Sequence, residues 1–216
     1  DEFALTSLAR AHAAQADGHF AAEITGIEVK EKKQSRLIDR DEQPLSAQPE
    51  KIPHLKPAFM EGGSVTAANA SSISDGAAAL VLAGDTGLES HQLKPRAKLV
   101  GHAGFAHAPG WFTTAPVHAA QKLLDKIGWQ KNEVDLWEVN EAFAVVAMAF
   151  IKELSLNAEQ VNIHGGACAL GHPIGASGAR TMVTLLHAMA KHDAHKGVAA
   201  ICLGGGEAIA MAVERV

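Results

Sequence analysis

The order of apolar and polar positions predicts the elements of the first part of the chain. Residues 1–19 carry apolar side chains close to helical spacing, and residues 20–30 alternate as a strand does. Residues 39–63 contain four prolines, which break helices and remove strand hydrogen bonds, so a loop is expected there. Residues 77–83 form a continuous apolar run, which is typical of a strand covered on both faces.

Strands and helices alternate in the second part. The expected strands cover 97–106 and 134–139 with a final pair within 197–213, and the expected helices cover 116–127, 141–154 and 177–191. This alternation predicts an α/β domain of layered helices and sheet over residues 94–216. A sheet of five strands is expected. Its order must be mixed, because a tight turn joins the last two strands.

Composition narrows the class of protein. The chain has 216 residues, of which 47% are hydrophobic, and a net charge of −5 without a dense Lys/Arg block, so no nucleic-acid surface is expected. Its most apolar segment, 197–213, is short for a bilayer span and contains Glu207, so no membrane segment or membrane partner is expected. The first residue is Asp1, in a helical pattern already under way, which suggests a chain entered partway.

The two cysteines, Cys168 and Cys202, are too few for a disulfide framework and lack the C-x-x-C spacing. Free thiols in a reducing, cytoplasmic compartment are therefore expected. A zinc set could be drawn from these cysteines with His164 and His172, but the glycines and Pro173 between them prevent the regular helix that would align them. No metal is expected.

Two glycine-rich stretches carry the candidate chemistry, HGGACALGHPIGASGAR at 164–180 and CLGGGEAIA at 202–210. Neither contains G-x-G-x-x-G or a P-loop, so neither is expected to bind nucleotide phosphates. A cysteine serves as nucleophile or base, an imidazole tunes its protonation, and glycines let backbone N–H groups approach a reacting carbonyl. The pattern indicates acyl transfer. The simpler alternative is a packed cysteine in a strand and a hydrogen-bonded histidine in a loop.

These stretches, with VNEAFA at 139–144, resemble the three C-terminal active-site motifs of the thiolases. TAANASSISDGAAALVL at 66–82 resembles the coenzyme A loop of that family and its following strand, and WFTTAP at 111–116 resembles the start of a helix in its C-terminal domain. The resemblance covers essentially the whole chain. It implies a thiolase-like layered α-β-α fold and a coenzyme A thioester as substrate, with no separate cofactor.

The resemblance also implies roles for individual residues. Cys202 matches the base that deprotonates the nucleophilic cysteine and removes the α-proton of acetyl-CoA in condensation. His172 matches the histidine that activates the nucleophile and, with a water held by Asn140, forms an oxyanion hole. Gly204 would donate a backbone N–H to a second oxyanion hole. If Cys202 is a base, its thiol should be partly ionised near neutral pH, and a nearby His172 would be the reason.

Substrate contacts are implied at four further positions. The residues that match contacts to the pantetheine arm of coenzyme A are Ser71, Ala67, Ala142 and Phe143. Small and hydroxylated residues suit a thin, amide-bearing arm better than a phosphate. Cys168 matches no catalytic position and is expected to be a packed small residue.

The chain departs from the family at one point, because the acyl-accepting cysteine of thiolases lies in an N-terminal segment that has no counterpart here. The expected domains are part of the loop domain (1–73), the last strand region of the N-terminal domain (74–93) and the C-terminal domain (94–216). The expected function is acyl transfer in fatty acid metabolism on acetyl-CoA or 3-ketoacyl-CoA, as a homodimer or homotetramer with the missing N-terminal segment, this chain alone being inactive. The alternative is a non-catalytic remnant that binds coenzyme A or a partner chain.

Overall fold

The protein is described by a computed structural model that covers residues 1–32 and 34–216. Its main sheet contains β3 (Ala97–Ala106), β4 (Leu136–Val139), β5 (Lys196–Leu203) and β6 (Glu207–Arg215). The strand order is β3-β6-β5-β4. β4 runs parallel to β5, whereas β6 is antiparallel to both of its neighbours, so the expected mixed sheet is confirmed.

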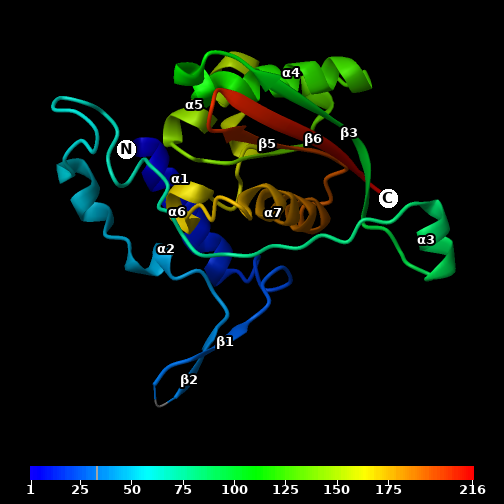
Figure 1. Ribbon diagram of the computed structural model, residues 1–216, viewed down its shortest axis with the longest axis horizontal. Coiled ribbons are helices and arrows are strands. Elements are labelled where there is room, and N and C mark those ends of the chain that lie inside the picture. The colour runs from blue at the N-terminus through cyan, green and yellow to red at the C-terminus, as the bar shows by residue number, and fades with distance from the viewer. Residues whose placement is uncertain (33) are drawn as a thin grey trace.

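Helices cover both faces of this sheet (Figure 1). α4 (Ala115–Ile127) and α5 (Ala144–Leu154) lie on one face, and α7 (Ser177–Lys191) lies on the other. α4 ends where Gly128 takes a left-handed conformation (φ 73°), as its sequence predicts. The expected layered α-β-α arrangement is therefore confirmed.

The N-terminal part wraps around this domain. α1 (Glu2–Ala16) buries one face against α6 (Ala167–Leu170) and joins it in a small apolar cluster. β1 (Ile27–Lys30) and β2 (Ser35–Ile38) form an antiparallel pair that projects from the body (Figure 1). The remaining short helices are α2 (Gln43–Ser46), η1 (Pro49–His54), α3 (Asp85–Ser90), η2 (Pro109–Thr114), η3 (Lys131–Glu133) and η4 (Ala158–Gln160).

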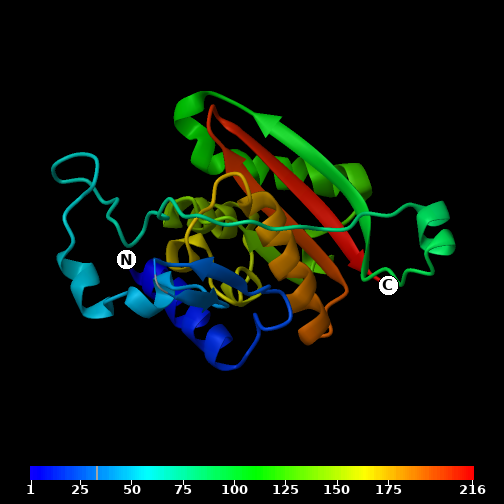
Figure 2. The same ribbon diagram turned by 60° about the horizontal axis from the view of Figure 1, so that its bottom comes forward.

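The prediction of five strands is wrong. The main sheet has four strands among the described residues, and residues 77–83 form none. This stretch runs as extended chain toward α3 in both ribbon views (Figures 1 and 2), with Val81 89% and Leu82 82% exposed. A strand needs a neighbouring backbone to pair with, and the described chain places none beside this stretch.

Other differences lie at element ends. The helix expected from Glu141 begins at Ala144, and the strand expected from Val134 begins at Leu136. Of the expected strand 20–30, only Ile27–Lys30 pairs in a sheet. In the described part of the chain, no helix has the length and apolar character needed to cross a bilayer.

Candidate active site

The site residues lie at one edge of the sheet. β4 and β5 are parallel, so their carboxyl ends meet there; Asn140 directly follows β4, and Cys202 lies near the end of β5. The Asn140 N–H donates to the Ala200 carbonyl at 2.9 Å, which continues the ladder and fixes Asn140 beside β5. His172 reaches the same region from the loop after α6, and its N–H donates to the Ser72 carbonyl at 2.9 Å.

The ring of His172 is held in a defined tautomer. Its Nδ1 lies 2.6 Å from Ser177 Oγ, and that hydroxyl donates its single proton to the Pro173 carbonyl at 3.0 Å. Ser177 Oγ therefore accepts from Nδ1–H, which leaves a lone pair on Nε2. Nε2 faces the Asn140 amide, with 3.5 Å between Nε2 and Nδ2.

The charge state of His172 fits a proton acceptor. Burial lowers the pKa of this imidazole, and the positive charge of Arg180 lowers it further. The ring is accordingly neutral at pH 7, with Nε2 free to take a proton.

Asn140 is completely buried, and its Oδ1 atom has no hydrogen-bond partner among the described residues. A buried amide oxygen without a protein partner is costly and is the kind of group that an ordered water satisfies. This observation fits the predicted water-holding role of Asn140.

Cys202 differs from expectation in its protonation. The residue is 6% exposed, and burial raises the pKa of its thiol to about 11. His172 is not among the causes of this shift, and the described residues show no hydrogen bond between the two side chains. The prediction that Cys202 is partly ionised near neutral pH is therefore wrong for this structure, because desolvation outweighs the backbone hydrogen bond that lowers the pKa.

Cys168 is a packed residue in α6. It is 8% exposed, and burial together with the neighbouring Glu141 raises the pKa of its thiol far above the ordinary value. Such a thiol is inert near neutral pH, in agreement with the absence of a predicted catalytic role.

The glycines of the site serve two purposes. Gly204 lies in the exposed turn between β5 and β6, where a side chain would meet no atom within 4 Å, so its backbone is accessible. Gly165, Gly166 and Gly206 are instead sites of close packing: a Cβ there would overlap the α1 backbone, the Glu141 carboxylate and the His107 carbonyl, respectively. The sequence interpretation treated all these glycines as approaches to a reacting carbonyl, and for these three the structure assigns a packing role.

Three of the four predicted coenzyme A contacts lie together. The backbone N–H and the hydroxyl of Ser71 both donate to the Ala142 carbonyl, at 3.0 and 2.9 Å. Ala70 pairs with Phe143 in an antiparallel bridge, so the loop lies along this segment. Ala67 is exposed in a neighbouring turn, and no hydrogen bond or bridge in the described structure joins it to the other three. Its role stays a prediction.

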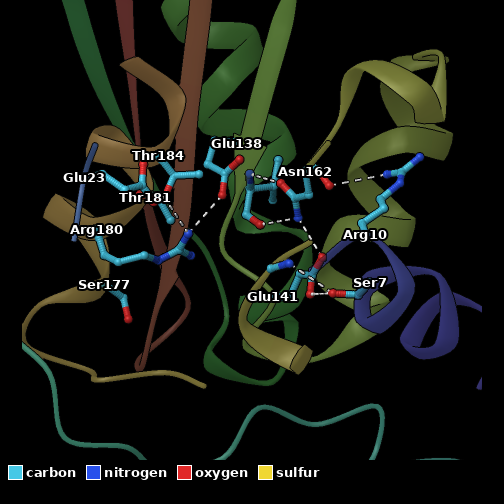
Figure 3. Close-up of polar contacts among 12 residues, drawn as sticks. Ser7, Arg10, Glu23, Glu138, Glu141, Asn162, Ser177, Arg180, Thr181 and Thr184 are labelled. Carbon is cyan, nitrogen blue, oxygen red and sulfur yellow. Dashed lines mark hydrogen bonds and ion pairs between the residues drawn. The ribbon is translucent and has the colours of Figure 1, made fainter. Parts of the chain in front are cut away.

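A buried network under the site escaped the sequence analysis. Glu141 is completely buried beside Asn140, and its carboxylate accepts from Ser7 Oγ at 2.7 Å, Asn162 Nδ2 at 2.8 Å and the Cys168 N–H at 3.1 Å (Figure 3). Burial raises the pKa of Glu141, and these hydrogen bonds oppose the shift. The network joins α1 to the segment that carries Asn140.

A second polar cluster lies between α7 and the sheet. Arg180 Nη1 donates to Glu138 Oε1 at 3.0 Å, and Thr184 Oγ1 donates to Glu23 at 3.1 Å (Figure 3). Burial raises the pKa of Glu138 to about 8 and that of Glu23 to about 7, although Arg180 opposes both shifts. The cluster spans 138 to 184 in sequence and includes Glu23, which is why no local motif revealed it.

Comparison with known proteins agrees with this geometry. Residues 93–215 match the family described as "Thiolase, C-terminal domain", and residues 1–86 match "Thiolase, N-terminal domain". The chain belongs to the thiolase family.

Individual relatives are similar over the whole chain. An acetyl-CoA acetyltransferase of Allochromatium vinosum is 45% identical over 100% of this chain and 55% of its own length, and a cytosolic acetyl-CoA acetyltransferase of Rattus norvegicus is also 45% identical. Among solved structures, an acetyl-CoA acetyltransferase of Bacillus anthracis superposes with a TM-score of 0.96 at 40% identity, covering all of this chain and 55% of the other. A thiolase of Ascaris suum in complex with coenzyme A gives a TM-score of 0.90 at 41% identity over the same shares. The chain thus spans about 55% of the length of these relatives.

Proposed function

We propose that this chain supplies the proton-transfer and oxyanion-binding half of a thiolase active site. The reaction is acyl transfer between coenzyme A thioesters, either Claisen condensation or thiolysis. One observation carries the proposal: the unprotonated Nε2 of His172 faces the Asn140 amide at the edge of the sheet where Cys202 also lies. A base, an oxyanion donor and a thiol at one sheet edge are what carbon–carbon bond formation next to a thioester requires.

His172 would act in two states. The neutral ring first accepts the proton of a nucleophilic thiol at Nε2, and the resulting imidazolium then donates a hydrogen bond from the same atom to a thioester oxygen. Ser177 holds Nδ1–H throughout, so one ring orientation serves both states. The Asn140 amide next to Nε2, with a water on its Oδ1, would complete the oxyanion hole.

Cys202 at rest is a thiol, which suits one direction of the reaction directly. In cleavage of a 3-ketoacyl thioester, the leaving enolate carbon takes a proton, and a thiol whose pKa is raised to about 11 holds that proton until the carbanion forms. In condensation the same sulfur would first give its proton to the coenzyme A thiolate that leaves on acyl transfer, and the resulting Cys202 thiolate would then remove the α-proton of acetyl-CoA. Gly204, two residues further on, would direct its N–H at the acyl carbonyl.

The acyl-accepting cysteine must come from elsewhere, since the two cysteines of this chain are Cys202 and the inert Cys168. We infer that a further polypeptide segment, corresponding to the part of the relatives that this chain does not span, supplies it. The exposed apolar stretch 77–83 supports this inference, because such a run gains stability by pairing with a strand from that segment. Assembly into a homodimer or homotetramer remains part of the proposal.

The substrate class follows from two kinds of support. The segment formed by Ser71, Ala142 and Phe143 is half-buried and presents small and aromatic groups. The Ascaris suum relative was solved with coenzyme A, and several relatives are named for acetyl-CoA. We propose acetyl-CoA or 3-ketoacyl-CoA as substrate, a place in fatty acid metabolism, and, from the two free thiols, a reducing cytoplasmic setting.

A second candidate is a non-catalytic protein that binds coenzyme A or a partner chain. It is favoured because neither cysteine of this chain matches the acyl-accepting cysteine of thiolases. Thiolysis of acetoacetyl-CoA by the protein purified from its source, with mass spectrometry of every polypeptide in the sample, separates the two. The proposal predicts a companion polypeptide and measurable turnover. Asn140→Ala should slow that turnover through a loss of about 2 to 4 kcal/mol of transition-state stabilisation. Coenzyme A binding without turnover would instead support the second candidate.

A further inference from the structure

Three histidines that are far apart in sequence come together outside the catalytic residues. One ring nitrogen from each of His19, His164 and His192 lies within 4.8 Å of the other two. The Nε2 atoms of His164 and His192 are 3.4 Å apart, and the ring centroids of His19 and His164 are 4.4 Å apart. His19 follows α1, His164 precedes α6, and His192 caps α7.

We propose that these three histidines bind a divalent transition metal ion, with zinc as the best match to the donor set. Imidazole nitrogens are preferred zinc ligands, and tetrahedral Zn–N bonds of about 2.0–2.1 Å place two such nitrogens about 3.4 Å apart. The His164–His192 separation already has this value. The third ring closes the remaining distance by rotation, which the half-buried side chain of His19 and the exposed side chain of His192 allow.

The state of the rings supports the same conclusion. His19 Nδ1 is buried without a hydrogen-bond partner among the described residues, although a buried ring nitrogen ordinarily has one. Burial lowers the pKa values of His19 and His164, the latter to about 4, so both rings are neutral at pH 7 and ready to ligate. Lys191 adds to this lowering and also opposes a bound cation, whereas Asp17 beside His19 favours one.

Surrounding residues define the kind of site. Phe20 packs edge-on against the His164 ring and keeps that side apolar, whereas His192 is exposed to water. With three protein ligands, the fourth position would hold water. The ion would join the end of α1 to the loop before α6 and to the end of α7, and so would stabilise the packing of the N-terminal segment on the C-terminal domain.

Of these three histidines, only His164 belongs to the zinc set that the sequence spacing suggested. That set also contained Cys168, His172 and Cys202, and over the described residues the one group with ligand atoms close enough for a metal is the histidine triad. The triad therefore argues against the sequence expectation that no metal binds.

Metal titration of the purified protein tests the proposal. The protein should carry no histidine tag and should first be treated with a chelator. Co²⁺ serves as a spectroscopic probe and Zn²⁺ as the ligand in calorimetry. The proposal predicts one tight site per chain, a visible Co²⁺ spectrum of the tetrahedral type, and a higher unfolding temperature with Zn²⁺.

Three variants sharpen the test. His192→Ala and His19→Ala should each weaken Zn²⁺ binding at least about 100-fold and abolish the rise in unfolding temperature. His195→Ala, at an exposed histidine three residues from His192, should bind as the parent does. Because the His192 side chain is exposed, its replacement leaves the fold intact and the result readable. Binding that is absent in the parent protein, or equal in the parent and His192→Ala, would overturn the proposal.

Discussion

The Nδ1 atom of His172 lies 2.6 Å from Ser177 Oγ, at the first residue of α7. Because that hydroxyl gives its own proton to the Pro173 carbonyl, it fixes the tautomer that leaves Nε2 free. Ser177→Ala should therefore lower kcat for thiolysis by about 10- to 100-fold, with a small change in KM, because the ring loses its orientation and not its substrate contacts. The pH dependence of kcat should shift as well.

Thr181→Val is the matched control for this change. Thr181 is equally buried one turn along α7, and its hydroxyl donates only to the Gly178 carbonyl at 3.0 Å. The control should show a similar loss of stability without the loss of kcat. Equal kcat values for Ser177→Ala and the parent protein would show that Ser177 does not position the His172 ring for catalysis.

Protonation of Cys202 gives a second prediction. In the Cys168→Ser background Cys202 is the only thiol, so its alkylation by iodoacetamide reports its ionisation directly. Since burial raises its pKa to about 11 from about 9, alkylation should be slow at pH 7 and should rise with pH through about 11. Because the folded state holds this proton more tightly than the unfolded state does, the free energy of unfolding should fall as the pH rises from about 9 to about 11.

Unfolding the same variant in urea should return the alkylation profile to the ordinary thiol range near 9. A reaction rate in the folded protein that already reaches its plateau below pH 8 would mean that an unseen positive charge stabilises the thiolate. Cys202 would then rest as a base.

The buried pair of Arg180 and Glu138 gives a stability prediction. Glu138 is 3% exposed and its pKa is raised to about 8, so above that pH Arg180→Met leaves an unpaired carboxylate in the interior and should cost about 3 to 5 kcal/mol in the free energy of unfolding. Arg215→Met, which removes an ion pair to the exposed Asp193, should cost much less, because solvent screens that pair. Urea unfolding of both variants checks the difference, and comparable losses would contradict the assigned burial.

The glycine-rich motifs and the spacing of apolar residues were enough to predict the layered fold, the mixed sheet and α7 from Ser177 to Lys191. These signals act within a few residues, so they were sufficient to predict elements that form from local sequence. They failed at 77–83, where an apolar run predicts a buried strand only if a partner strand is present.

Relations between distant segments were not predictable. The contact of Ser7 with Glu141 crosses 134 positions, and the triad of His19, His164 and His192 draws on three separate segments. The ionisation of Cys202 was predicted with the wrong sign, because burial depends on the packing of the whole sheet edge and not on neighbours in sequence.

Exchange of the methyl protons of acetyl-CoA with solvent deuterium tests the central proposal most directly, because it requires the base and the oxyanion hole but not the acyl-accepting cysteine. NMR of acetyl-CoA incubated with the purified protein and its companion polypeptide measures the rate. The account predicts enzyme-dependent exchange that falls about 100-fold in both Cys202→Ser and Asn140→Ala and stays within about twofold in Cys168→Ser. Exchange at the parent rate in Cys202→Ser or in Asn140→Ala would contradict it.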